Sequence, residues 1–277
     1  MMMKDLMVVV DDSAAAESTF AYAVSMAKAF EAHLAVLYPV PVLPPAVYMG
    51  IEYSTEWLAA ISDNLDQNEQ TAKKKYLEKA EAADIEIEWR TEEGEPSQVV
   101  TEQSRYVDMT IITQSMSDEE ENASRNLSGH FLLETGRPVL IVPHIGATPG
   151  LPKNVLVAWD DSRTSTRALN DAMPLLSSAE SVQLFTINSS GKTRETKEVS
   201  AIDISKHLAR HGINVETRVL VATDIDPADL LLSHVADMGN DLIVMGAYGH
   251  SRLRELVLGG MTREILQSMT VPVLMSH

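Results

Sequence analysis

The chain has no cysteine, no long apolar run and few basic residues relative to its acidic ones. The absence of cysteine excludes disulfides and thiolate chemistry, and it fits a reducing compartment. No apolar run approaches the roughly 20 residues that a membrane-spanning helix requires, and the one at the N-terminus is too short for a signal sequence. We therefore expect a soluble, cytoplasmic protein.

Charge is distributed unevenly over the 277 residues. The net charge of −18 argues against sequence-independent binding to nucleic acid or to an anionic membrane, because phosphate binding requires clustered lysine and arginine. Residues 1–150 carry −15, from 10 basic and 25 acidic side chains, whereas residues 151–277 carry −3, from 12 and 15. The second half would therefore repel a polyphosphate ligand much less than the first.

An internal repeat divides the chain. Three pairs of segments match in the same order in both halves: 4–13 with 153–162, 107–115 with 240–248, and 136–144 with 270–277. The first pair reads KDLMVVVDDS and KNVLVAWDDS. We interpret the repeat as a tandem duplication with one domain in residues 1–145 and another in residues 152–277, joined by a segment rich in proline and glycine.

The pattern within each half predicts the fold. Short runs of β-branched and other apolar residues alternate with helical stretches, and runs such as LIVM and MTIIT lack the polar alternation of half-exposed strands. This order predicts two flavodoxin-like α/β domains with open parallel sheets. We expect the short strands 139–142 and 272–275 to pair across a pseudo-twofold axis. In the second half we predict strands near 154–159, 182–187, 214–220, 241–245 and 272–275. The predicted helices of this half lie near 163–177, 195–211, 227–238 and 261–268. In the first half we predict a long helix at 55–82.

A segment rich in glycine follows the fourth predicted strand of the second half, with glycine at Gly246, Gly249, Gly259 and Gly260. Glycine permits positive φ and close approach of backbone amides to phosphate, and a helix that starts at this point would favour an anion. Ligands of open parallel sheets bind where strand order reverses, which should bring Asp160, after the first strand, to the neighbouring position. The alternative is a tight β–α turn without a ligand, and the spacing alone does not decide between them.

The spacing G-x2-G-x9-G resembles the nucleotide loop of the universal stress protein family. The surrounding segments DLIVMGAYGHSRL, TREIL, VPVL and VLVAWDDS agree, and the resemblance covers essentially the whole chain as two copies. It implies a tandem member with an adenine nucleotide alpha hydrolase-like fold that binds ATP, with or without Mg²⁺. The implied nucleotide-binding residues are Asp160 near the ribose and adenine, the backbone of Ile187 against the base, Gly246, Gly249, Gly259, Gly260 and Thr262 at the phosphates, and His250 and Arg252 within the loop.

This sequence departs from the family pattern in both halves. Gly260 stands where the family usually has serine or threonine, which removes a hydrogen bond worth about 0.5–1.5 kcal/mol and lowers affinity by about tenfold. In the first half Thr113 and Met116 replace the first two glycines and Arg125 falls near the third. Four carboxylates, residues 118–121, stand where phosphates would bind. We therefore expect one nucleotide site, in the second half.

Other residues carry less functional information. His207 and His211 have i, i+4 spacing, which suits a metal, but they precede Gly212 and fit a helix C-terminus better. We expect Trp159 to belong to the core. No nucleophile elbow or acid–base pair is present, which favours a non-catalytic stress-response regulator whose nucleotide changes the surface offered to an unidentified protein partner. A ligand-free interaction module and a slow ATP hydrolase remain alternatives. The resemblance also implies that the chain imitates the family's dimer internally and can form a further homodimer.

Overall fold

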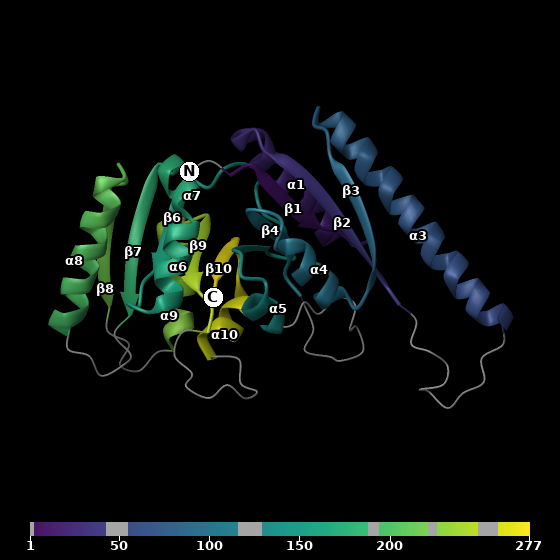
Figure 1. The fold of residues 1–277 in the computed structure, drawn as a ribbon. Coiled ribbons are helices and arrows are strands. Elements are labelled where there is room, and N and C mark those ends of the chain that lie inside the picture. The colour runs from purple at the N-terminus through teal and green to yellow at the C-terminus, as the bar shows by residue number, and fades with distance from the viewer. Residues whose placement is uncertain (1–2, 43–54, 116–128, 188–193, 221–225, 249–259) are drawn as a thin grey trace.

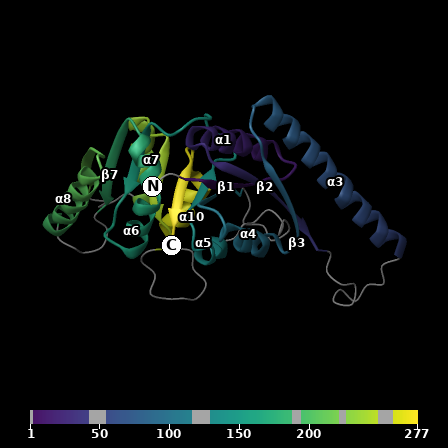
Figure 2. The same ribbon diagram turned by 45° about the horizontal axis from the view of Figure 1, so that its top comes forward.

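The structure is a computed structural model that describes residues 3–42, 55–115, 129–187, 194–220, 226–248 and 260–277. Its strands form one ten-stranded sheet, along which the two halves of the chain lie side by side (Figures 1 and 2). The strands are β1 (Asp5–Val9), β2 (His33–Pro41), β3 (Glu88–Gly94), β4 (Met109–Thr113), β5 (Val139–Val142), β6 (Asn154–Ala158), β7 (Ser181–Ile187), β8 (Val215–Leu220), β9 (Leu242–Gly246) and β10 (Val273–Ser276).

The strand order is palindromic. It runs β3-β2-β1-β4-β5-β10-β9-β6-β7-β8, so that each strand of the first half has its counterpart at the mirrored place in the second. Neighbouring strands are parallel within each half, and β5 pairs with β10 in antiparallel register, with Leu274 opposite Leu140. The open parallel α/β fold and the pairing of the two terminal strands are therefore confirmed.

The described helices agree with the predicted ones except at one place. A single helix was expected over 163–177, but the structure ends one helix at Asp171 and starts another at Met173. Pro174 explains the break, because it has no amide hydrogen and its ring clashes with the preceding turn. The helices are α1 (Ala14–Phe30), α3 (Thr55–Ala82), α4 (Pro96–Ser104), α5 (Gly129–Glu134), α6 (Arg163–Asp171), α7 (Met173–Ser178), α8 (Arg194–Arg210), α9 (Pro227–Met238) and α10 (Gly260–Ser268).

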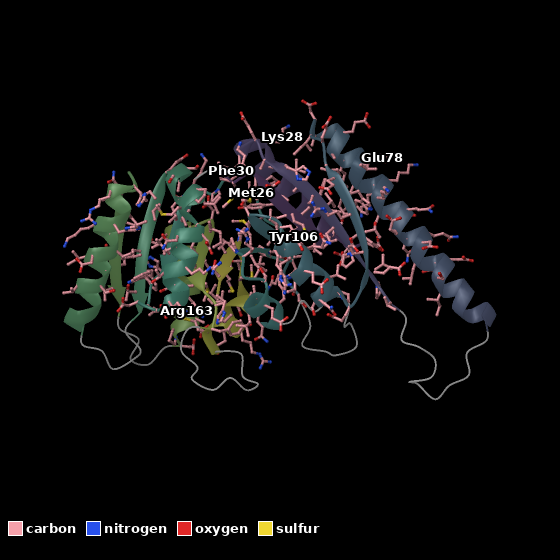
Figure 3. All side chains as sticks on the ribbon, in the orientation of Figure 1. Met26, Lys28, Phe30, Glu78, Tyr106 and Arg163 are labelled. Atoms are coloured by element: carbon pink, nitrogen blue, oxygen red, sulfur yellow. The ribbon has the colours of Figure 1, made fainter. Side chains whose placement is uncertain are left out.

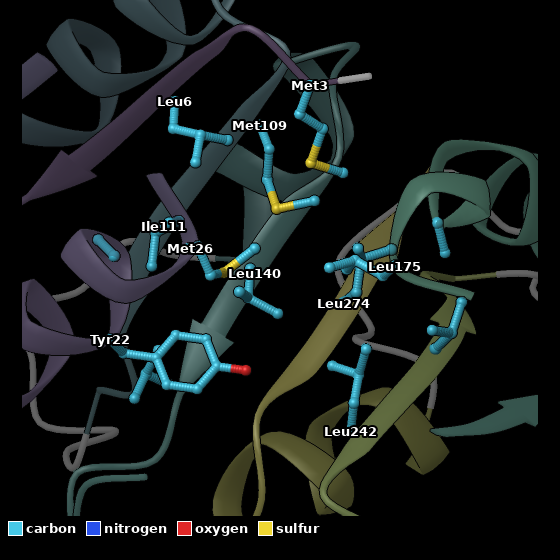
Figure 4. Close-up of a cluster of buried hydrophobic side chains, with 14 of the residues drawn as sticks. Met3, Leu6, Tyr22, Met26, Met109, Ile111, Leu140, Leu175, Leu242 and Leu274 are labelled. Carbon is cyan, nitrogen blue, oxygen red and sulfur yellow. The ribbon is translucent and has the colours of Figure 1, made fainter. Parts of the chain in front are cut away.

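The helices cover the sheet on both faces. Buried side chains of α1, α3, α6, α7 and α8 join one hydrophobic cluster, and those of α4, α5, α9 and α10 join another on the opposite face. The first cluster continues across the junction of the halves, where Leu140 and Leu274 belong to it together with Tyr22 of α1 (Figure 4). Burial, and then the carboxylate of Asp241 from the other half, raise the pKa of the Tyr22 hydroxyl. The two halves therefore share a core.

None of the helices in the described part of the chain combines the length and the apolar composition that a membrane crossing requires.

Candidate functional site

The carboxyl ends of β6 and β9 are neighbours in the sheet. The two strands pair in parallel, with Val157 opposite Val244, while β10 lies on the other side of β9. Asp160 follows β6 by two residues, and Gly246 is the last residue of β9. The predicted adjacency of these two strand ends is confirmed, and it marks the point where the strand order of the second half reverses.

A tight turn orients Asp160 at the start of α6. The Ser162 amide donates to Asp160 Oδ1 at 3.0 Å, and Asp161 between them has a left-handed φ of 67°. Ser162 is also the N-cap of α6: its Oγ accepts from the Ser165 amide, and Ser165 Oγ accepts from the Ser162 amide, both at 3.1 Å. The sequence DDS therefore ends the strand, holds the carboxylate and caps the helix within a few residues.

The first turn of α6 packs so closely against the end of β9 that position 246 must be glycine. A Cβ at this position would lie 2.5 Å from the Ser165 nitrogen and 2.5 Å from the Thr164 carbonyl carbon, a distance that real Cβ atoms do not adopt. Packing between β9 and the first turn of α6 thus explains the first glycine of the motif without reference to a ligand. Any phosphate-binding role of Gly246 is additional to this structural one.

Tyr248 and Thr262 connect the two ends of the glycine segment. Tyr248 has a φ of 58°, and its amide donates to Thr262 Oγ1 at 3.4 Å. Thr262 is only 4% exposed, and its contact with the phosphates, which the resemblance implied, stays a prediction. Burial raises the pKa of Tyr248 to about 12, and its ring lies edge-on to His277 at 6.5 Å. Sequence reasoning missed Tyr248, which stands between two motif glycines.

Two arginines of α6 lie close enough to the carboxyl end of β10 to affect the charge of His277. Burial, and then the charges of Arg163 and Arg167, lower the pKa of His277, the residue that follows β10. Arg163 is the first residue of α6, and Figure 3 labels its side chain. Cationic side chains at a strand end favour an anionic ligand.

The remaining predicted site residues are placed as follows. Gly260 is the first residue of α10 and is exposed, and a Cβ there would meet no atom of the described residues within 4 Å. Ile187 is the last residue of β7, opposite Leu220 of the edge strand. The other four predicted residues, Gly249, His250, Arg252 and Gly259, lie outside the described part of the chain.

Trp159, His207 and His211 lie outside this site. Trp159 is buried in the core, as predicted, and its Nε1 donates to Ser200 Oγ at 3.0 Å. The rings of His207 and His211 contact each other edge to face, with centroids 4.8 Å apart. Among the described residues, no group of three histidine, aspartate or glutamate side chains could hold a metal ion.

The first half repeats the aspartate turn but not the glycine. The Ser13 amide donates to Asp11 Oδ1 at 2.7 Å, as Ser162 does to Asp160. Thr113 ends β4 at the place of Gly246, and its Oγ1 lies 2.8 Å from Thr19 Oγ1 on α1. A side chain therefore occupies the space that the second half leaves for the backbone of α6. The acidic residues 118–121 lie outside the described residues.

Gln114 links the first half to the helix that follows the glycine segment. Its Nε2 donates to the carbonyl oxygens of Leu266, at 2.7 Å, and Gln267, at 3.3 Å, near the end of α10. Its Oε1 accepts from the His144 amide at 3.0 Å, and the side chain is 5% exposed. The equivalent residue of the second half is Ala247, since the amides of both residues donate to the last residue of the adjacent terminal strand. No sequence pattern identified this contact.

Comparison with known proteins agrees with the duplicated fold. A universal stress protein of Synechocystis sp. is 29% identical over 150 residues, which are 47% of this chain and 51% of that protein. A crystal structure of a universal stress protein from Archaeoglobus fulgidus aligns with 98% of this chain and 97% of its own, at 18% identity and a TM-score of 0.76. A universal stress protein in complex with cAMP aligns with 46% of this chain, at 21% identity and a TM-score of 0.36. The chain spans about half the length of the curated relatives it matches.

The family assignment follows from a match to both halves. The sequence profile of the Universal stress protein family matches residues 2–142 and again residues 152–277, which together make up nearly the whole chain. These segments are also the two halves of the palindromic sheet. The chain therefore belongs to the universal stress protein family, as a member with two tandem copies of the family's domain.

Proposed function

We propose that the second half binds ATP at the carboxyl ends of β6 and β9, and that the protein acts as a non-catalytic stress-response regulator. The observation that carries the proposal is the meeting of three features at this strand-order reversal. The Asp160 turn lies beside the end of β9, α10 begins after the glycine segment, and Arg163 of α6 supplies positive charge nearby. Backbone amides at a helix N-terminus and cationic side chains favour phosphate oxygens.

The start of α10 offers backbone amides to such a ligand. Gly260 is the first residue of this nine-residue helix, and among the described residues no atom lies within 4 Å of its Cβ position. When bound, ATP would supply a polyphosphate for these amides and a ribose for the carboxylate of Asp160. Nucleotide occupancy would change the surface around the ends of β6 and β9, and a regulatory protein would then distinguish the occupied from the empty state.

Features of the first half support the proposal that each chain has one nucleotide site, in the second half. Thr113 fills the position of Gly246, and the acidic segment 118–121 would oppose phosphate. Two tyrosines also contact the aspartate turn of this half: Tyr76 OH donates to the Asp11 carbonyl at 2.8 Å, and Tyr38 OH to Asp12 Oδ2 at 3.4 Å. We expect this half to act as a scaffold.

A pair of matched alanine variants tests the site. Asp160→Ala should weaken ATP binding at least about tenfold, because a charge-assisted hydrogen bond to ribose is worth about 1.5–3 kcal/mol. Asp11→Ala removes the equivalent carboxylate and the same turn hydrogen bond in the first half, and should leave affinity unchanged. Isothermal titration with ATP, with and without magnesium, measures both and should give one site per chain. An absence of heat, together with purified protein that carries no nucleotide, would refute the proposal. If both variants lose the same ATP affinity, the site is not confined to the second half, and the proposal of one site there is wrong.

Substitution of Gly260 tests the start of α10. Gly260→Ser restores the hydroxyl that the family pattern has at this position, and the open space around Gly260 accommodates it. We expect ATP to bind up to about tenfold more tightly, through one added hydrogen bond to a charged oxygen. Gly260→Ala is the control, since it adds the Cβ without the hydroxyl. If both variants bind ATP like the parent protein, the phosphates do not lie at this helix start.

A further inference from the structure

Helix α3 presents one face to the sheet and the other to solvent. Ala72, Tyr76 and Ala80 are buried on the inner face at four-residue spacing. Figure 1 shows α3 as the outermost element of the first half, beside the edge strand β3. Leu77 is 41% exposed, so a large apolar side chain lies outside the packed stripe. An exposed leucine alone needs no explanation, but this one lies next to a groove.

The groove is formed where the chain turns back after α3. Asp84 has a left-handed φ of 52°, and the Ile85 amide donates to the Ala80 carbonyl at 3.1 Å, so the chain folds back against the last turns of the helix. The groove has a volume of about 870 Å³, and its lining includes four apolar residues, Leu77, Ala80, Ile85 and Ile87, beside charged ones. An apolar side chain of a partner would remove the exposed surface of these four residues from water, and the charged residues around them could form ion pairs with it.

Charges along the same face are separated by sign. Lys73 and Lys74 line the groove on the N-terminal side of Leu77, and four acidic residues, Glu78, Glu81, Asp84 and Glu86, line it on the C-terminal side. Figure 3 labels Glu78 on this helix. Lys74 lies 3.9 Å from Glu78, and neither Lys73 nor Glu81 forms an ion pair with another described residue. Such a face is complementary to a copy of itself that runs in the opposite direction.

We propose that two copies of this chain associate through α3, in antiparallel orientation about a two-fold axis near Leu77. In that arrangement Lys73 of each copy faces Glu81 of the other, because both are four residues from Leu77. The leucines of the two copies meet over the grooves. A two-fold interface brings the same patch of both copies together, so each such contact occurs twice.

Two features favour a second copy over another occupant. Strand β5 already pairs with β10 within the chain, so a further copy cannot join the sheet there and needs another surface. The basic and acidic side chains of the groove lie on opposite sides of Leu77, so a second copy that runs in the opposite direction places lysines opposite carboxylates. A basic peptide would suit the glutamates, but it would be repelled by Lys73 and Lys74.

A charge-reversal cycle tests the proposal, with sedimentation equilibrium of the full chain as the measurement. Lys73→Glu and Glu81→Lys should each raise the dimer dissociation constant at least about tenfold, because each places two like-charge pairs in the interface. The double variant restores opposite charges in both pairs and should return the constant to within about threefold of the parent value. Lys206→Glu makes the same charge change on α8, the equivalent helix of the second half, and should have no effect.

The possible results distinguish a dimer through α3 from a monomer, from a dimer through another surface and from binding of a basic partner. A parent protein that stays monomeric at about 100 μM would overturn the proposal, as would a double variant that fails to dimerise while circular dichroism shows it folded. A dimer that is insensitive to either single variant would assign association to another surface. Binding of a fluorescent polylysine peptide that Glu81→Lys abolishes, without dimerisation of the parent, would assign the groove to a basic partner. ATP titration is independent of these results, since Lys73 and Glu81 lie outside the nucleotide-binding half.

Discussion

Gly246→Val should destabilise the protein by about 3 kcal/mol or more, although it only adds atoms to the end of a strand. The Cβ would lie 2.5 Å from backbone atoms of Thr164 and Ser165, and backbone cannot move aside as a flexible side chain can. Either α6 shifts away from β9 or the end of β9 distorts, and both lose buried contacts on the sheet. Urea denaturation followed by circular dichroism gives the change in unfolding free energy.

Gly260→Ala serves as the stability control for this variant. Both glycines belong to the same glycine-rich segment, but a Cβ at Gly260 meets no atom of the described residues within 4 Å and lies at the start of a helix. Alanine there should be neutral or stabilising by up to about 1 kcal/mol, since it restricts the unfolded chain. A loss below about 1 kcal/mol for Gly246→Val would mean that β9 and α6 are not packed as described.

Leu274→Asp should have a comparable or larger effect, about 4 kcal/mol or more. Leu274 is 0% exposed in β10, which lies in the middle of the sheet, and it faces Leu140 across the pairing of the two halves. A carboxylate at this place would be buried among apolar side chains without a partner, or would take up a proton at a similar cost. We expect most of the protein to unfold or aggregate at 37 °C, which thermal denaturation and gel filtration measure.

Leu133→Asp makes the same change on α5 at a side chain that is 40% exposed. It should cost less than about 1 kcal/mol, because the carboxylate can remain hydrated. Should Leu274→Asp prove as mild as this control, the hydrophobic cluster would not continue across the junction of β5 and β10.

The sequence predicted the fold well because its signals are local and repeated. Apolar runs without alternation mark strands that are covered on both faces, and the duplication supplies each strand twice. The neighbouring positions of β6 and β9 followed from a general rule about open sheets, and the pairing of β5 with β10 followed from the repeat and the family resemblance. The helix break near Ala172 was missed, since Pro174 was not weighed as a helix breaker.

Contacts across the fold could not be predicted in the same way. Gly246 is explained by the backbone of Thr164, which is 82 residues away in sequence and comes close only in the folded chain. The hydrogen bonds of Gln114 to the carbonyls of α10 connect residues 152 and 153 positions apart. Neither a glycine nor a glutamine reveals in sequence which backbone group it will meet. Thr262 likewise has a hydroxyl that suits a phosphate or an amide, and the sequence alone does not show that the Tyr248 amide donates to it.

The antiparallel contact of β5 with β10 occurs within one polypeptide, and this changes how it responds to dilution. Two separate domains that met only through these short strands would come apart at low concentration. Here residues 143–153 join them, and a short connection holds its ends at an effective concentration on the order of millimolar. The sheet therefore stays continuous at any protein concentration in a cell. At the contact of β5 with β10, each half meets the other half and not a copy of itself. A substitution in one of these strands therefore enters this contact once, and the two halves are free to diverge into unequal roles.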